Sequence, residues 1–272
     1  MQMGLLFLLA FAVLSLPGVA GPLGIRAAHA ITIHTVSGSL DSTLCTTNGG
    51  SWSLVPSSTC TLSSGVEWEV ATSTTLTIPS GINLVVSGGS GINNDGTIDN
   101  AGGINIQEFF GNSGTIDNSG GILSQDIFYN YGTINNPGYL ENRWDFENRG
   151  GTIDNSGTIE NTGTGSGIGS DFWNDGTITN YGTIDNQATF ENDGTIDNYG
   201  TISNPHAFYI EGNPIINECG GILYGSYPAG GYTQVACPPG VPEFSTFGPF
   251  LLTALVFPAL LIATRRFRRT SV

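Results

Sequence analysis

The triplet Gly-Thr-Ile recurs nine times in the middle of this chain, and its spacing constrains the fold more than any other feature. Successive triplets are 18, 18, 19, 6, 19, 6, 12 and 6 residues apart, so every interval is a multiple of six within one residue. The triplets begin at Gly96, Gly114, Gly132, Gly151, Gly157, Gly176, Gly182, Gly194 and Gly200. A short fixed period is typical of repeat proteins, in which each unit packs against its neighbours. The repeating unit is a hexad with the consensus Asn-x-Gly-Thr-Ile-x.

Three hexads make an 18-residue coil, and the fifth place of each hexad is apolar. Six coils begin at positions 94, 112, 130, 148, 174 and 192. The two aliphatic columns are Ile98, Ile116, Ile134, Ile153, Ile178 and Ile196, and Ile104, Ile122, Leu140, Ile159, Ile184 and Ile202. The third column is Phe110, Phe128, Phe146, Phe172, Phe190 and Phe208. A single coil cannot bury these apolar side chains by itself. Coils stacked about 4.8 Å apart would bury them, because each column would then pack against its own kind. The sequence therefore predicts an all-β fold, a parallel β-solenoid of about six coils over residues 94–209.

The other hexad places suit this fold. Gly in the third place suits a tight bend with positive φ. Asn in the first place suits an amide ladder, in which each side chain bonds to the next coil. Only the fourth coil breaks the period, with 26 residues, and we place its eight extra residues in a loop around Thr162 to Gly169.

These hexads resemble two known kinds of solenoid. The six-residue units with Ile in one fixed place resemble the left-handed hexapeptide β-helix. The recurring sequence pattern Gly-Thr-Ile-x-Asn is similar to that of the right-handed β-solenoids of bacterial adhesins. The hexapeptide pattern usually has Ser, Thr, Ala or Val where this chain has Gly, so both hands stay open, with a preference for the right-handed one.

The flanks of the repeats are expected to cap the open ends of the solenoid, because open sheet edges invite aggregation. Residues 31–93 would form an N-terminal cap with irregular first coils, and residues 210–240 a C-terminal cap. Six coils would separate the caps by roughly 25 to 30 Å, whereas a disulfide needs Cα atoms within about 7 Å. We therefore predict the pairs Cys45–Cys60 and Cys219–Cys237.

Both termini point to export. Residues 1–30 combine an apolar stretch from Gly4 to Leu16 with Ala28-His29-Ala30, a cleavage site of the A-x-A kind. They predict a signal peptide that is cleaved after Ala30 or, as an alternative, after Ala20; an uncleaved anchor is the other interpretation. Phe244 to Thr264 is uncharged and long enough to span a bilayer. The basic residues that follow it, Arg265, Arg266, Arg268 and Arg269, predict a cytoplasmic tail and an external solenoid.

This C-terminus resembles the PEF-type sorting signal of archaeal surface proteins. The resemblance rests on Pro242-Glu243-Phe244, the apolar segment and the Arg cluster, over residues 241–272. It is also similar to the bacterial PEP-type signal, which has Pro where this chain has Phe244. The resemblance implies recognition by an archaeosortase, a transpeptidase-like enzyme that removes the helix and transfers the new carboxyl end to a lipid or glycan carrier. The alternative is a plain single-pass membrane anchor.

Charge limits the partners. The chain has no Lys and a net charge of −15. Within residues 31–242 the basic residues are Arg143 and Arg149, whereas every acid except Glu243 lies there, so the mature surface would be more acidic still. Such a surface repels nucleic acid and anionic membranes. Surface polysaccharide and neighbouring cells are the partners that we expect.

Candidate sites are few, and none of them is catalytic. Asp99, Asp117, Asp154 and Asp197 share one hexad place, with Asn135 and Thr179 between them, and Ca²⁺ is the only cofactor such a column could hold. The simpler interpretation is a solvated acidic face. A Thr column consists of Thr97, Thr115, Thr133, Thr152, Thr177 and Thr195, a pattern that suits ice or carbohydrate but also simply favours strands. Three rim aromatics, Tyr129, Trp173 and Tyr209, could stack on sugars.

The function predicted from these features is a non-enzymatic structural or adhesive protein, exported to the cell surface. Enzymes on β-helices that act on polysaccharides generally place acids beside basic groups, and this chain offers Arg143 and Arg149 alone outside its ends. A polysaccharide-active enzyme and a cation- or ice-binding surface protein are the alternatives.

Overall fold

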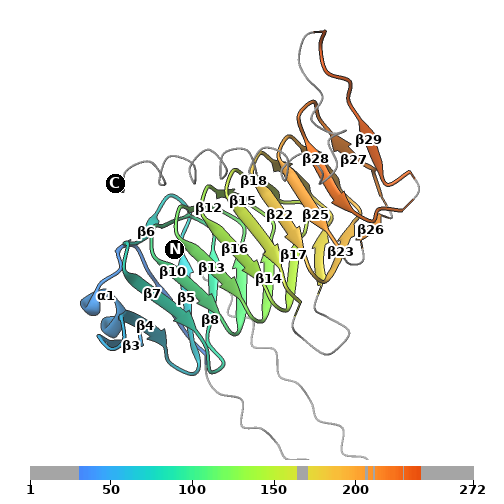
Figure 1. Ribbon diagram of the computed structural model, residues 1–272. Coiled ribbons are helices and arrows are strands. Elements are labelled where there is room, and N and C mark those ends of the chain that lie inside the picture. The colour runs from blue at the N-terminus through green and yellow to red at the C-terminus, as the bar shows by residue number, and fades with distance from the viewer. Residues whose placement is uncertain (1–30, 164–170, 206–207, 211, 229, 240–272) are drawn as a thin grey trace, which may run out of the picture. The chain divides into compact units, whose positions relative to one another are not determined.

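We describe the protein from a computed structural model that covers residues 31–163, 171–205, 208–210, 212–228 and 230–239. These residues form one short helix, α1 (Ser42–Thr47), and 29 strands in three sheets (Figure 1). The all-β prediction is confirmed. The predicted signal peptide, the sorting signal and most of the loop in the fourth coil lie outside the described residues.

The chain visits the three sheets in turn, so that three consecutive strands make one coil. Sheet I contains β1 (Thr32–Thr35), β5 (Val66–Val70), β8 (Gly91–Asn94), β11 (Phe109–Asn112), β14 (Ile127–Asn130), β17 (Asp145–Asn148), β20 (Asp171–Asn174), β23 (Thr189–Asn192) and β26 (Phe208–Ile210). Sheet II contains β2 (Gly38–Ser39), β6 (Thr75–Ile78), β9 (Thr97–Asn100), β12 (Thr115–Asn118), β15 (Thr133–Asn136), β18 (Thr152–Asn155), β21 (Thr177–Asn180), β24 (Thr195–Asn198), β27 (Ile215–Asn217) and β29 (Tyr232–Gln234). Sheet III contains β3 (Gly50–Ser53), β4 (Ser58–Leu62), β7 (Ile82–Val86), β10 (Gly103–Ile106), β13 (Gly121–Ser124), β16 (Tyr139–Asn142), β19 (Thr158–Asn161), β22 (Thr183–Asn186), β25 (Thr201–Asn204) and β28 (Ile222–Gly225).

The strand register is the one that the hexads predict. Neighbouring strands are parallel, except that β3 runs antiparallel to β4. Phe110 lies opposite Phe128, Ile116 opposite Ile134, and Ile104 opposite Ile122. Each predicted column therefore consists of like residues stacked on one another, and the parallel β-solenoid is confirmed.

The solenoid is longer than the repeat alone predicts. It has about eight turns instead of six, because coils without the Gly-Thr-Ile triplet continue the sheets at both ends, including the part of the chain, residues 31–93, where irregular first coils were expected. At the N-terminal end, Leu76 lies opposite Ile98 and Leu84 opposite Ile104, so aliphatic residues fill the same inward places. At the C-terminal end, β27 and β28 extend sheets II and III. The strict hexad consensus therefore underestimates the length, whereas inward apolar residues mark it.

The extra residues of the fourth coil lie in two places. Asn148 and Asn155 are seven positions apart where other coils have six, and Gly150 absorbs the additional residue with a φ of 68°. The other seven residues fall between β19 and β20, where the loop was predicted. The placement of all eight around Thr162 to Gly169 was therefore wrong by one residue.

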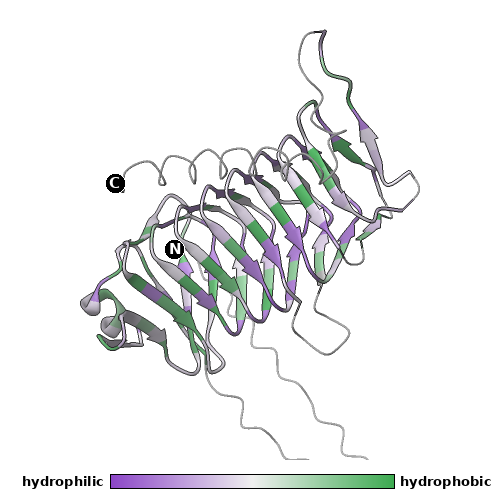
Figure 2. Cartoon of the chain, in the orientation of Figure 1, coloured by the Kyte–Doolittle hydropathy of each residue, from purple (hydrophilic) through white to green (hydrophobic). Residues whose placement is uncertain are grey.

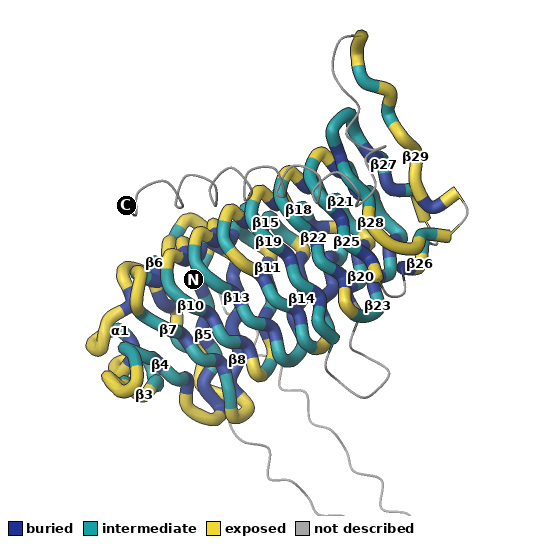
Figure 3. Tube along the Cα trace, viewed as in Figure 1, coloured by how far each residue is buried: buried dark blue, intermediate teal, exposed yellow. Residues whose placement is uncertain are grey.

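The core is a row of stacked side chains. All of the predicted Ile, Leu and Phe columns are buried, and Phe neighbours have ring centroids 4.6 to 4.9 Å apart. Figure 2 shows apolar residues recurring at matching places along successive strands, and Figure 3 shows buried and half-buried strands joined by exposed turns. Burying one such side chain stabilises the fold by roughly 1.5 to 3 kcal/mol. A single coil could not bury these side chains, because each is covered by its counterparts in the coils above and below.

Asn ladders line the corners of the core, as predicted. In the longest ladder, each side-chain amide donates to the Oδ1 atom of the next Asn, at N···O distances of 2.7 or 2.8 Å. Its members are Asn100, Asn118, Asn136, Asn155, Asn180, Asn198 and Asn217. A second ladder runs from Asn94 to Asn192 and a third from Asn142 to Asn204. These amides also bond to backbone carbonyls, so the next coil satisfies the buried amides, except for the Oδ1 atom of Asn94 at the start of its ladder.

The hexad glycines serve a different purpose from the one predicted. None of the glycines of the triplets has a positive φ. Instead, a Cβ atom on Gly132 would lie 2.1 Å from the carbonyl oxygen of Gly114, and Gly114 and Gly194 show the same approach to their own neighbours. Glycine is therefore needed because stacked turns come too close for any side chain, and the prediction of a left-handed bend was wrong.

Candidate functional site

The four cysteines form the two predicted disulfides. Cys45 on α1 pairs with Cys60 on β4, with Cα atoms 5.8 Å apart. Cys219 pairs with Cys237 at a Cα distance of 4.8 Å. Each bond fastens one end of the solenoid locally, as expected for caps, and neither crosses from one end to the other.

The predicted acidic column is in register on the outer face of sheet II. Asp99 lies opposite Asp117, Asn135 separates Asp117 from Asp154, and Thr179 separates Asp154 from Asp197. Asn135 donates to the Asp117 carboxylate at 2.6 Å. Within the described ranges, no three His, Cys, Asp or Glu side chains gather in a way that could hold a metal ion. The structure therefore brings only Asp99 and Asp117 together.

The Thr column lies on the same face. The six threonines are in register from Thr97 to Thr195, and all are half-buried. Their regularity follows from the coil stack itself.

The three rim aromatics lie on the outer face of sheet I but not side by side. Glu147 separates Tyr129 from Trp173, and Glu191 separates Trp173 from Tyr209. The indole of Trp173 donates to Asp193 at 2.9 Å. Aromatic and acidic side chains therefore alternate up this sheet.

Tyr129 instead belongs to an aromatic cluster that the hexads alone do not mark. Its ring packs edge-on against Phe109 and Tyr131, at centroid distances of 5.9 and 6.3 Å. Arg149 lies over the Tyr129 ring at 4.0 Å, donates to the Tyr131 hydroxyl at 3.3 Å and forms an ion pair with Glu147. The hydrogen bond to Glu147 raises the pKa of Arg149, so the cation that braces the cluster is permanent.

Beside this cluster, sheet I has a hollow of about 340 Å³. Phe109 and Gly111 of β11 line one side of it, together with Tyr131. Glu67, Glu69, Asn93 and Asp95 line the other. The hollow thus sets aromatic rings opposite carboxylate and amide groups.

Sheet III has a larger hollow, of about 420 Å³, with a different lining. Gly103 and Gly121 are in register at its floor, in a place where later coils carry Thr158, Thr183 and Thr201. Pro56 and Tyr139 contribute to its lining, and the buried Oδ1 atom of Asn105 in this hollow has no hydrogen-bond partner. A carboxylate is absent from the described residues that line this hollow.

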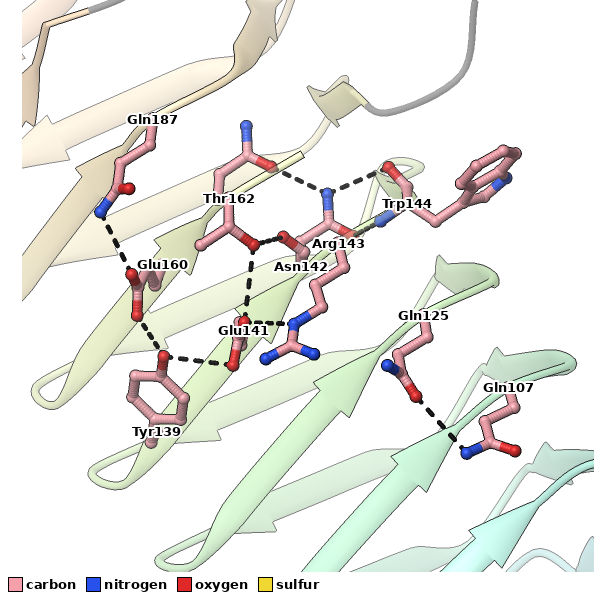
Figure 4. Close-up of polar contacts among 11 residues, drawn as sticks. Gln107, Gln125, Tyr139, Glu141, Asn142, Arg143, Trp144, Glu160, Thr162 and Gln187 are labelled. Atoms are coloured by element: carbon pink, nitrogen blue, oxygen red, sulfur yellow. Dashed lines mark hydrogen bonds and ion pairs between the residues drawn. The ribbon is translucent and has the colours of Figure 1, made fainter. Parts of the chain in front are cut away.

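Tyr139 joins that hollow to a polar network on the same face (Figure 4). Its hydroxyl donates to Glu160 and lies 3.4 Å from Glu141, which accepts a charged bond from Arg143. Gln187 donates to Glu160 at 3.1 Å and to Asp185 at 2.9 Å. Burial raises the pKa of Tyr139, and its hydrogen bond to Glu160 raises that pKa further, so the phenol remains a donor.

No protein family, curated protein or solved structure matches this chain. Sequence reasoning missed Phe109, Tyr131, Tyr139, Glu141 and Glu160 as site residues. The available signal was the replacement of the usual Thr or larger residue by Gly103, Gly111 and Gly121, because a missing side chain opens a hollow on a regular face.

Among the residues that the structure describes, no helix is long and apolar enough to cross a membrane. The predicted span, 244–264, and the sorting motif lie outside those residues, so both stay predictions.

Proposed function

We propose that this protein is a non-enzymatic structural or adhesive protein of the cell surface. The observation that carries the proposal is the continuous stacking of Asn, Ile and Phe columns through the repeat coils. A scaffold in which every coil is bonded and packed to the next holds its outer faces in fixed positions, which suits display and attachment. The acidic surface keeps such a repetitive β-protein soluble.

Export and anchoring are part of the same proposal. The chain would lose residues 1–30, pass outside, and be held by the C-terminal signal or by its helix. The two disulfides support this, because disulfides persist in oxidising compartments.

The two arginines favour display over catalysis. Arg143 is paired with Glu141 and Arg149 with Glu147. A cation that is already neutralised by a neighbouring carboxylate is poorly placed to stabilise negative charge in a reaction.

The test is the intact mass of the protein recovered from its own cell surface, together with the adhesion of cells that lack it. We expect a chain that begins near Ile31, ends near Pro242 and carries an added lipid or glycan, and we expect the deletion strain to detach at lower shear. A mass that retains Phe244 to Val272 unmodified would replace sorting with a plain anchor. Unchanged adhesion, or a protein found only inside cells, would contradict the surface role.

A polysaccharide-active enzyme is the second candidate, because Glu141, Glu160 and Asp185 are in register next to the hollow on sheet III. Release of reducing sugar from polysaccharides by the wild type, lost in Glu160→Gln, would establish it. No release by either protein would leave the structural proposal alone.

A further inference from the structure

We propose that the hollow on sheet I is a binding site for an uncharged glycan, which contacts Phe109 and Tyr131 on one side and Asn93 and Asp95 on the other. The inference rests on the proposed adhesive function and names its ligand class. At about 340 Å³, the hollow falls within the range of roughly 300 to 1,000 Å³ that small-molecule sites occupy.

The aromatic side of the hollow is exposed and held in place. Phe109 is 39% exposed and Tyr131 50% exposed, so both rings are accessible to a ligand. Tyr129 packs against both rings, and Arg149 contacts both tyrosines. Because the rings are already ordered, a ligand that stacks on them loses less conformational freedom on binding. The apolar face of a sugar ring is the kind of surface that aromatic rings accept.

The opposite side offers acceptors for hydroxyl groups. Glu67 accepts a hydrogen bond from the Asn93 amide, which fixes the orientation of that amide. Glu69 and Asp95 add two more carboxylates. Hydrogen bonds to charged groups contribute more than neutral ones, and a glycan hydroxyl is a suitable donor. The same carboxylates repel a uronate or sulfate, which is why the ligand should be uncharged.

Gly111 explains why the hollow lies at this coil. In the same column, the coils above carry Tyr129, Glu147 and Trp173, whereas this one carries Gly111. A Cβ atom on Gly111 would lie 3.0 Å from the Asn93 Oδ1 atom and 3.2 Å from the Phe109 ring. A longer side chain would displace the Phe109 ring or the Asn93 amide, so Gly111 allows both groups to take their places in the lining of the hollow.

The experiment uses the full protein recovered from the cell surface and titrates it calorimetrically with cellohexaose, laminarihexaose, mannohexaose and chitohexaose, with polygalacturonate as the anionic control. Tyr131→Ala removes an exposed ring, and Gly111→Leu displaces the Phe109 ring or the Asn93 amide. Tyr181→Ala is the matched control, because Tyr181 is also exposed but stacks on Tyr199, away from the hollow. Thermal unfolding of each variant checks that it is folded.

We expect at least one neutral hexasaccharide to bind, with roughly three- to tenfold weaker affinity in Tyr131→Ala, no measurable binding in Gly111→Leu, and wild-type affinity in Tyr181→Ala. Polygalacturonate should not bind. If no neutral probe binds the wild type at millimolar concentration, or if folded Tyr131→Ala binds as the wild type does, the site is overturned. Surface recovery and shear adhesion are measured on the same strains, so loss of the glycan site with intact display leaves the proposed function standing.

Discussion

The first complete coil, β5 to β7, and the repeat coils place different residues at the same inward corners. Val70 lies opposite Asn94, and Ile78 opposite Asn100. All four residues are buried. An aliphatic corner needs only apolar neighbours, whereas a buried Asn needs hydrogen-bond partners for its amide. The comparison shows that the core does not require Asn, and that most Asn corners find these partners in a stack of their own kind.

The ends of the ladders show the cost of this dependence. The buried Oδ1 atom of Asn94 has no partner, because the side chain of Val70 beneath it carries no hydrogen-bond donor. At the other end of the protein, Asn217 donates to the side chain of Gln234 at 2.6 Å. The ladder of Asn94 thus begins with an unsatisfied acceptor, whereas the ladder of Asn217 ends on the side-chain amide of Gln234.

The largest expected effect tests the turns of the two regions. The turn between β5 and β6 has four residues, 71–74, whereas the corresponding turns before β9, β12 and β15 have two residues, the second of which is Gly. Gly132→Ala should lower the free energy of unfolding by about 3 kcal/mol or more, because its Cβ atom would meet the Gly114 carbonyl at 2.1 Å. Gly121→Ala is the control, since nothing lies within 4 Å of its Cβ position. Urea unfolding would measure both, and equal losses would show that close approach is not the reason for these glycines.

The second prediction compares the middle of a ladder with its end. Asn136→Val removes an acceptor of Asn118 and the donor to Asn155, and should cost about 2 to 3 kcal/mol, because it leaves buried groups unpaired. Asn94→Val removes the donor to Asn112 Oδ1 and to the Thr115 carbonyl but also removes the unsatisfied Asn94 Oδ1 atom, and should cost about 1 kcal/mol. Chemical unfolding of the two variants gives the difference. Equal costs would mean that the amides act independently and that the stack adds nothing.

The third prediction converts the apolar coil toward the repeat type. Val70→Asn supplies a donor for the Asn94 Oδ1 atom but buries an acceptor of its own above Val36. We expect the free energy of unfolding to fall by about 1 kcal/mol, which is less than for Asn136→Val. Asn94→Val should cost more in the Val70→Asn background than it does alone. A double-mutant cycle measures this coupling. A coupling of zero would show that the two side chains do not bond.

Most of the fold could be predicted because the hexad links sequence position directly to position in a coil. The columns from Ile98 to Ile196 and from Phe110 to Phe208 follow from period alone, and so does the Asn ladder. The first coil could not be counted in the same way, because Leu76 and Leu84 keep the inward places but lack the triplet. The purpose of the glycines was also hidden, since a bend and a close approach both select Gly.

The site was less predictable, because it depends on contacts between coils. The position of Tyr129 in its hexad could be derived from the repeat, but its neighbours Phe109 and Tyr131 come from other strands and turns. Arg149 takes the hexad place of Tyr131 one coil further on, but its contact with the Tyr129 ring depends on the conformation of a long side chain, which the repeat does not specify. Hollows arise where a regular place loses its side chain, so Gly103, Gly111 and Gly121 were the informative positions.

The smallest expected effect concerns the C-terminal end, where the stack closes on a half-buried phenol instead of an aliphatic corner. Tyr227 packs against Phe208, and burial raises its pKa above the usual value of 10.0. A raised pKa means that the unfolded chain loses this proton first as the pH rises, so the contribution of Tyr227 is complete below pH 10 and is lost progressively above it. Tyr227→Phe should therefore flatten the alkaline decline in the free energy of unfolding, whereas Tyr181→Phe, at an exposed turn, should not. Urea unfolding between pH 8 and about 11 would measure this, and an unchanged slope in Tyr227→Phe would place the alkali-sensitive group elsewhere in the solenoid.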